Sequence, residues 1–333
     1  MKVAPATIKD IAKALNVAPS TVSRALHDHP AISEETKKKV FELARELDYH
    51  PNVIAFNLKK KRSNTVGIIV PDLAHHYFSS IISSIQEVLF KEGYNVLICQ
   101  SNEDADKEKD VLNTLLSNQV DGLLISVART TTDISIFDSI IKKEVPIVFF
   151  DRMVKELEGK VNGVWIDDYA AGYLLTERLI KEGCKRLALI SAPLSLNIGT
   201  QRLRGFRRAL ENSNMEINED LFFETDLTMD DSIRITKNII SMNVDGIVVA
   251  GGIATKGCLI ALETGNQINK GKIKVAGFMN DLYPGHKEPG LIRVVTPTKE
   301  MGKLAAQNLL AQINGTLTQK KNVVLQPLLK IDL

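Results

Sequence analysis

The sequence of 333 residues has few cysteines and no long apolar run. Its three cysteines, Cys99, Cys184 and Cys258, lie far apart and form no Cys-x-x-Cys pair, which argues against a disulfide framework and against a zinc site. Apolar stretches such as Gly67–Val70 and Gly246–Ala250 are far shorter than the ~20 residues that cross a bilayer. Because no apolar segment follows the first residues, we expect no secretory signal, no membrane partner, and a location in the reducing cytoplasm.

The sequence also lacks a large excess of either charge, since it has 42 Lys and Arg and 40 Asp and Glu. The basic side chains are unevenly placed: residues 1–62 carry 12 basic against 7 acidic side chains, whereas residues 63–333 carry 30 against 33. A basic segment ahead of a near-neutral remainder indicates a nucleic-acid-binding part on a larger body. The alternative interpretation is a lysine-rich helix face without such a partner.

The first fifty residues have the apolar spacing of short helices. We expect three of them, over residues 8–15, 19–26 and 33–47. Thr7 with Asp10 can cap the first helix, Pro19 suits the first position of the second, and Ser33 precedes two glutamates at the start of the third. Two helices joined by a tight turn and closed by a third make a helix-turn-helix unit. A three-helix bundle that contacts another protein is the alternative.

In a helix-turn-helix unit the start of the second helix enters the major groove of DNA. The outward residues there are Pro19, Ser20, Thr21, Ser23 and Arg24. An arginine can form a bidentate contact with guanine, and the hydroxyl groups can bind bases or phosphates. The spacing therefore favours DNA binding by this helix.

Several ordered motifs follow one another at fixed distances. The run Ala6–Ala12 (ATIKDIA) precedes Pro19–Leu26 (PSTVSRAL), which is followed by Leu47–Asn52 (LDYHPN) and Ala55–Lys59 (AFNLK). In these motifs, and onward to its C-terminus, the chain resembles the LacI/GalR family of bacterial repressors. The resemblance implies a sequence-specific transcriptional regulator, a repressor, that binds a palindromic operator as a homodimer at the nucleoid.

The resemblance gives residues 51–63 the role of a hinge helix that folds on operator DNA. Leu58 then takes the position that wedges into the minor groove, and Lys59 the neighbouring groove contact. Without the resemblance, the run Lys59–Arg62 indicates a flexible basic linker. The complete set of expected DNA contacts is Thr7, Pro19, Ser20, Thr21, Ser23, Arg24, Ser33, Asn52, Ala55, Leu58 and Lys59.

From Thr65 onward, short Val- and Ile-rich runs alternate with amphipathic helices, as in parallel sheets covered on both faces. Nine strands are expected, over residues 65–70, 94–100, 122–126, 146–150, 163–167, 187–191, 221–223, 246–250 and 274–278. The fold class is therefore an N-terminal all-α helix-turn-helix head plus an α/β, periplasmic-binding-protein-like body of two parallel-sheet subdomains. The resemblance, in whose family the chain crosses between subdomains three times, implies a head over 1–50, a hinge over 51–63, a first subdomain over 64–162 plus 294–320, and a second over 163–293 plus 321–333.

Ligands of such bodies bind between the subdomains, at the carboxyl ends of the strands. The resemblance places a small-molecule effector there, a sugar or an acidic or phosphorylated sugar derivative, and gives Arg202 the clamping role. A guanidinium suits a carboxylate, a phosphate or vicinal hydroxyls. The expected ligand-binding residues are Tyr77, Phe78, Ser126, Asp151, Arg152, Arg202, Gly251, Met279 and Thr296. No cofactor and no metal are expected.

The chain departs from the family pattern at several of these places. Gly251-Gly252 stands where many members carry Asn-Asp, Met279 where many carry aspartate, and Leu227 where a stacking aromatic is frequent. The loss of carboxylates argues against a neutral sugar in the usual pose and favours an acidic or phosphorylated one. In the head, Ala18 replaces a capping serine, which removes a cap worth ~1 kcal/mol, and Phe56 replaces a polar hinge residue.

The sequence bears on three alternative functions. An enzyme is disfavoured because the sequence has no nucleophile elbow, phosphate loop or dinucleotide fingerprint, and the adjacent His75 and His76 cannot grip one metal as an i,i+4 helix pair would. A transport-type binding protein is disfavoured by the DNA-binding head. A regulator whose body binds a protein partner or a co-repressor stays open, as do the effector's identity and its direction of action.

Overall fold

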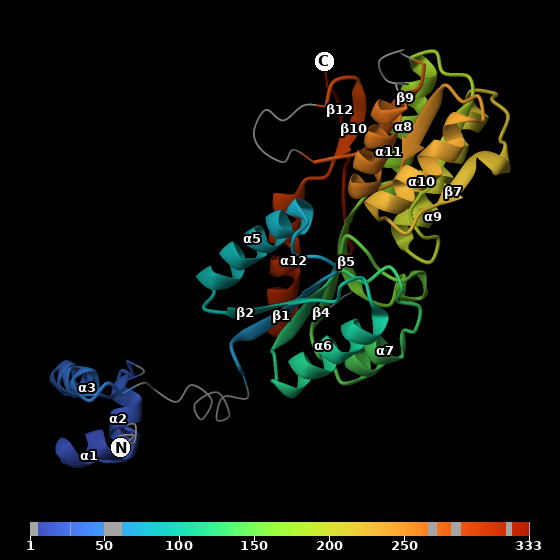
Figure 1. The fold of residues 1–333 in the computed structure, drawn as a ribbon. Helices are drawn as coiled ribbons and strands as arrows, with labels where there is room; N and C mark the ends of the chain where they lie inside the picture. Colours follow the sequence, from blue (N-terminus) through green and yellow to red (C-terminus); the bar gives the residue numbers. More distant parts are fainter. Residues whose placement is uncertain are drawn as a thin grey trace. The chain divides into compact units, whose positions relative to one another are not determined.

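The structure is a computed structural model, and it describes residues 6–26, 28–49, 62–265, 272–280, 288–317 and 322–332. The chain divides into two compact units, residues 1–63 and 64–333, which we call the head and the body (Figure 1). Each unit is described by itself.

The described residues of the head form three helices around a small apolar core. They are α1 (Ile8–Ala14), α2 (Pro19–Leu26) and α3 (Glu34–Glu46), which confirms the three helices expected from the sequence. Ile11, Val22 and Val40 are fully buried where these helices meet. The amphipathic spacing of the sequence is therefore satisfied by one shared core.

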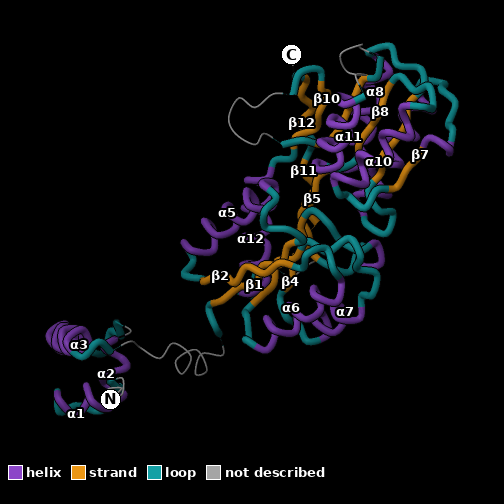
Figure 2. Tube along the Cα trace, viewed as in Figure 1, coloured by secondary structure: helices purple, strands orange, loops and turns teal. Residues whose placement is uncertain are grey.

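Two six-stranded sheets form the body, with helices on both faces of each (Figures 1 and 2). The first sheet contains β1 (Thr65–Val70), β2 (Asn95–Gln100), β3 (Gly122–Ile125), β4 (Ile147–Phe150), β5 (Asn162–Ile166) and β11 (Asn322–Leu325). The second contains β6 (Leu187–Ser191), β7 (Phe222–Glu224), β8 (Gly246–Val249), β9 (Lys274–Phe278), β10 (Leu291–Val295) and β12 (Leu328–Ile331). Two 3-10 turns, η1 (Lys155–Leu157) and η2 (Glu219–Leu221), lie outside the sheets.

The strands of each sheet are almost all parallel. Their orders are β11-β5-β4-β3-β1-β2 and β12-β10-β9-β8-β6-β7. Among the strands that the structure describes, only β12 and β10 pair antiparallel, with Ile292 opposite Ile331. Parallel strands buried on both faces explain the nearly continuous apolar runs of β1, β3 and β6.

Helices pack on both faces of each sheet and enclose three apolar clusters. On the first sheet these are α5 (His76–Lys91) and α12 (Thr298–Ile313) on one face, and α6 (Ala105–Ser117) and α7 (Ser135–Lys142) on the other (Figure 1). On the second sheet α8 (Asp168–Lys181) packs with α9 (Asn197–Asn212), and α10 (Met229–Ile240) packs with α11 (Gly252–Thr264). Among the described residues no helix is long and apolar enough to cross a membrane.

The chain passes between the sheets three times, and each passage lies a few residues after its expected place. Residues 163–166 were assigned to the second subdomain, but β5 pairs with β4 and β11 in the first sheet, so the passage follows Ile166. The other passages follow Val295 and Leu325, rather than residues 293 and 320. A buried parallel strand has the same apolar pattern in either sheet, so the sequence could not assign these strands.

Candidate functional site

The start of α2 is the part of the head expected to read DNA. Pro19 is its first residue, and the carbonyl of Ala18 accepts hydrogen bonds from the amides of Thr21 and Val22 at 2.8 and 3.2 Å. Position 18 has no side chain that could cap the helix, as the departure from the family pattern implied. Arg24 is exposed on the same helix. The expected contacts Pro19, Ser20, Thr21, Ser23 and Arg24 all lie on α2.

Two further expected DNA contacts lie at helix starts. Thr7 precedes α1, where its amide and hydroxyl donate to Asp10 Oδ2 at 2.8 and 2.7 Å. Ser33 precedes α3 and accepts a hydrogen bond from the Thr36 amide. The remaining expected contacts, Asn52, Ala55, Leu58 and Lys59, lie outside the described residues, as does Phe56. Their roles stay predictions.

The body contains a cavity of about 540 Å³ between its two sheets. Its lining residues follow the carboxyl ends of strands in both sheets, where parallel α/β folds place ligands. The volume falls within the ~300–1,000 Å³ of small-molecule sites. Among the nine expected ligand-binding residues, the lining contains Tyr77, Phe78, Asp151, Arg152, Arg202, Gly251, Met279 and Thr296.

Ser126 is the exception, and its placement on the cavity wall was wrong. The residue follows β3, and its amide still donates to the carbonyl of Ile69 at 3.0 Å, so the backbone remains paired there. Its side chain is fully buried and lines no part of the cavity. The same loop reaches the cavity only at Arg129.

Arg202 is held on the second-sheet side of the cavity by three contacts. Its Nε donates to Asp168 Oδ1 at 2.7 Å and its Nη1 to the carbonyl of Ala250 at 2.9 Å. The guanidinium carbon lies 3.6 Å from the centre of the Phe278 ring, a stacked cation–π contact. Burial raises the pKa of Asp168 to about 6, although the charge of Arg202 opposes this shift. The arginine is therefore fixed in position at the cavity wall.

A close crossing of α8 and α9 keeps Arg202 beside Asp168. A Cβ atom at Gly172 would lie 2.3 Å from the carbonyl oxygen of Arg202, and one at Gly205 would lie 2.1 Å from the carbonyl oxygen of Tyr169. These glycines let the two helix backbones approach more closely than alanine would permit. The spacing of the helices sets the length of the ion pair.

The first-sheet side of the cavity carries a second set of fixed polar groups. The hydroxyl of Tyr77 donates to Asp151 Oδ1 at 2.7 Å, and burial raises the pKa of this phenol, which keeps it protonated as a donor. Arg152 Nη1 lies 2.8 and 3.1 Å from the two carboxylate oxygens of Glu103. Asp151 and Arg152 thus have partners that hold them at the carboxyl end of β4.

His75 also lines the cavity, although the sequence gave it no ligand role. It precedes α5, and its Nδ1 accepts the amide hydrogen of Tyr77 at 3.2 Å. Burial, assisted by the charge of Arg152, lowers the pKa of the imidazole, which favours the neutral form. A neutral ring that accepts at Nδ1 carries its proton on Nε2, so His75 offers one further donor.

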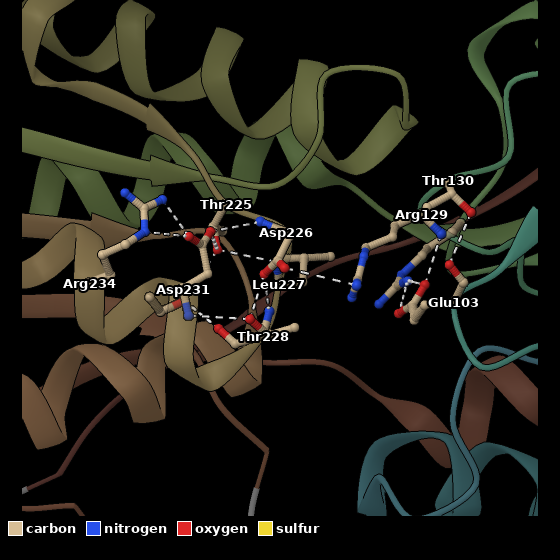
Figure 3. Close-up of polar contacts among 11 residues, drawn as sticks. Glu103, Arg129, Thr130, Thr225, Asp226, Leu227, Thr228, Asp231 and Arg234 are labelled. Atoms are coloured by element: carbon tan, nitrogen blue, oxygen red, sulfur yellow. Dashed lines mark hydrogen bonds and ion pairs between the residues drawn. The ribbon is translucent and has the colours of Figure 1, made fainter.

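A turn between β7 and α10 places Leu227 against the cavity (Figure 3). Leu227 has φ = +64°, and its amide donates to Thr225 Oγ1 at 3.2 Å. Asp226 Oδ1 accepts from the amide of Thr228 at 2.8 Å, and Asp226 Oδ2 lies 3.9 Å from Arg129 Nη2 on the first-sheet side. The turn therefore connects the lining of the cavity with an ion pair between the two subdomains.

Lining residues that the sequence did not single out include His75, Glu103, Arg129, Thr228, Met229, Lys256 and Asn280. Two of them have partners distant in sequence: Glu103 binds Arg152, and Asn280 Nδ2 donates to the carbonyl of Thr296 at 2.8 Å. No local motif marks such residues. Among the described residues, no group of histidine, cysteine or acidic side chains is arranged to hold a metal ion.

Comparison with known proteins decides the family. Residues 7–52 match the family described as bacterial regulatory proteins, lacI family, and residues 66–316 match the periplasmic binding protein domain. The regulator RegA of Clostridium acetobutylicum is 31% identical over 313 residues, which cover 93% of each chain. The chain belongs to the LacI family. It is a DNA-binding transcriptional regulator and not an enzyme.

Solved structures agree with this LacI-family fold. A Lac repressor dimer bound to operator and an anti-inducer superposes with a TM-score of 0.85 at 23% identity and covers 99% of this chain and 98% of that one. A complex of the regulator CelR with cellobiose has a TM-score of 0.74 at 25% identity and covers 98% of this chain and 99% of that one. The head and the two-sheet body are therefore the fold expected from the sequence.

Proposed function

We propose that this LacI-family protein is a homodimeric repressor whose operator affinity is set by a small molecule in the body cavity. The observation that carries the proposal is the cavity itself, which opens at the carboxyl ends of strands in both sheets. A ligand there touches both subdomains and stabilises one arrangement of them over another. Such differential binding to two states is what couples a ligand to a distant site.

The lining supports a sugar-derived ligand. It contains four basic residues, Arg129, Arg152, Arg202 and Lys256, and four acidic residues, Asp72, Glu103, Asp151 and Glu288. Carboxylates accept hydrogen bonds from sugar hydroxyl groups, and guanidinium or ammonium groups donate to hydroxyl, carboxylate or phosphate oxygens. The similar regulator CelR was solved as a complex with cellobiose, which supports a carbohydrate as the kind of ligand. The four basic residues of the lining are what supports an acidic or phosphorylated sugar derivative, because they can bind its negatively charged group.

Exposed apolar side chains on α5 and on the edge strand β2 of the first sheet support a dimer. Phe90 on α5 is 81% exposed, and Leu97 on the edge strand β2 is 41% exposed. Edge strands and exposed aromatic side chains are common where two chains meet. We propose that a second copy of this chain covers these side chains and so brings two heads to the two halves of one palindrome.

Genome-wide capture of DNA fragments with the purified full chain tests the function. We expect a short palindrome to be enriched, and Leu58→Ala to lose it while Lys39→Ala on α3 keeps it. A deproteinised metabolite extract added to the captured complex should change the yield of that palindrome. Absence of any enriched palindrome contradicts operator binding, and enrichment that survives Leu58→Ala contradicts the hinge assignment. An operator complex that responds to the protein fraction removed from the extract, and not to the deproteinised extract, favours a protein partner.

A further inference from the structure

The two sides of the cavity differ in chemistry. The first-sheet side presents mainly charged and hydrogen-bonding groups, among them Asp72, Glu103, Arg129, Asp151 and Arg152. The second-sheet side presents Arg202 within a mainly apolar surface formed by Leu227, Met229, Ile253, Phe278 and Met279. We call this surface the apolar wall. A ligand that fills the cavity meets polar partners on one side and hydrocarbon on the other.

The turn that carries Leu227 is built to keep this side chain on the wall (Figure 3). A φ of +64° is unfavourable for leucine, and it persists only where surrounding bonds impose it. Here the Leu227 amide is bound to Thr225, the Asp226 amide donates to Asp231 Oδ2 at 3.1 Å, and Asp226 binds Thr228. The side chain is only 8% exposed. The hydrogen bonds of this turn fix an apolar group rather than a polar one at the cavity.

The glycine at position 251 belongs to the same arrangement. A Cβ atom on Gly251 would lie 2.9 Å from Leu227 Cδ2, so a side chain there would compete with Leu227 for space. Gly252 adds no side chain, and Met279, which follows β9, is buried to 8% exposure and contributes a thioether to the wall. The polar lining side chains on the second-sheet side are Arg202, Thr228, Lys256, Asn280, Glu288 and Thr296, and Asn280 is already paired with the backbone of Thr296 through both atoms of its amide.

We propose that the effector is a glycoside-type ligand with an apolar substituent, such as an aryl group, that lies on the apolar wall. The proposal rests on the proposed function, because it narrows the ligand of the same cavity. The polyhydroxyl head faces Asp151 and Arg152, and the aryl group faces Leu227, Met229 and Met279. A free sugar would leave hydroxyl groups against hydrocarbon without partners, which disfavours it, whereas an aryl group gains by leaving water.

Calorimetric titration of the full chain with matched ligands tests this inference. The probes are methyl and phenyl β-glucosides and β-galactosides, each with and without a 6-phosphate. We expect the phenyl form to bind at least about tenfold more tightly than the methyl form in one or more pairs, because burying an aryl ring exceeds the ~1.4 kcal/mol of a factor of ten. The phosphate arm separately measures the preference for an acidic ligand.

Leu227→Asn is the decisive variant. Asparagine adopts positive φ more readily than leucine, so the turn should persist while the wall loses its apolar group. We expect the ratio of phenyl to methyl affinity to fall to less than about threefold, with the affinity for the methyl form unchanged. The control is Leu194→Asn, at an exposed leucine outside the cavity lining, which should behave as the wild type.

Two results would overturn the inference: a phenyl form that binds no better than its methyl form, or a phenyl advantage that Leu227→Asn leaves intact. If none of these glycosides binds while the metabolite extract still changes operator binding, the aryl glycoside is wrong and the proposed function stands. If the metabolite extract also leaves operator binding unchanged, both the aryl glycoside and the proposed function are wrong.

Discussion

Arg202 and Asp168 form a buried ion pair beside the ligand cavity, with 2.7 Å between Arg202 Nε and Asp168 Oδ1. Their side chains are 7% and 4% exposed. A guanidinium fixed in this way needs no rearrangement to meet a ligand, because the direction of its remaining donors is set by the protein. The same ion pair therefore stabilises the second subdomain and orients the guanidinium group that faces the cavity.

Removing one partner of this pair should destabilise the body strongly. Arg202→Met leaves Asp168 buried beside an apolar side chain, and breaking a buried pair in this way costs about 3–5 kcal/mol. The double variant Arg202→Met with Asp168→Asn should recover part of that loss. Urea unfolding followed by circular dichroism measures both, with Arg208→Met, at an exposed arginine of the same helix, as the control. Equal midpoints for Arg202→Met and the control would contradict the account.

The glycine contacts between α8 and α9 predict a second effect on the same site. Gly205→Ala places a methyl group 2.1 Å from the carbonyl oxygen of Tyr169, so the helices must separate at a cost of ~1–3 kcal/mol. Gly252→Ala is the matched control, since its Cβ would meet nothing closer than 3.7 Å and its φ is not positive. We expect Gly205→Ala to lower the melting temperature and Gly252→Ala to leave it unchanged or slightly higher. The reverse order would exclude the proposed helix contact.

Glu108 should make the stability of the body depend on pH. This carboxyl is buried on α6, accepts hydrogen bonds from the Ala128 amide and the Thr131 hydroxyl, and has its pKa raised by burial to about 7. The folded state holds this proton more tightly than the unfolded state, so the free energy of unfolding should fall as the pH rises from about 4.5 through 7.

The comparison with Glu108→Gln isolates this contribution. At about 1.4 kcal/mol for each unit of pKa shift, the wild type should lose a few kcal/mol relative to Glu108→Gln across that interval. Glu87→Gln, at an exposed glutamate of α5, removes a carboxyl without this dependence. Denaturant titrations at a series of pH values give the difference directly, and parallel curves for wild type and Glu108→Gln would refute the prediction.

The exposed apolar side chains of Phe90 and Leu97 should hold the dimer together. Phe90→Lys combined with Leu97→Lys places two charges in the proposed interface, where they lose hydration without partners. Light scattering after gel filtration should then give the mass of one chain in place of two. Leu328→Lys, at an exposed leucine of β12 in the other sheet, should leave the dimer intact. A dimer that survives the double variant would place the interface elsewhere.

Much of the fold follows from local pattern, and the exceptions have physical causes. The apolar runs predict β1 to β9, but β10 is interrupted by Arg293, whose charge is matched by Asp332 at 2.8 Å, a partner that no local spacing reveals. The strand β12 is exposed along its whole length, so it has no buried face to mark it. Both strands depend on contacts between residues far apart in the sequence.

The sequence predicts those site residues that stand in a recognisable family motif. It does not predict those whose position depends on hydrogen bonds between residues far apart in the sequence. Tyr77, Asp151 and Arg202 line the cavity as expected. Glu103 does so because it binds Arg152, which lies 49 residues away, and the turn of Leu227 depends on bonds that no composition shows. The prediction for Ser126 was wrong because its side chain is fully buried away from the cavity lining, and the family motif does not reveal this orientation.

A titration of operator DNA with a cavity-blocked variant tests the central claim most directly. Gly252→Phe fills the cavity from a position with free space, and Gly252→Ala leaves it open. The account predicts that metabolite extract changes the operator affinity of the wild type and of Gly252→Ala by about tenfold or more, within the usual range of allosteric coupling. Gly252→Phe should bind the operator as the wild type does without extract and should not respond to it. A response of Gly252→Phe equal to that of the wild type would contradict control of the head by this cavity.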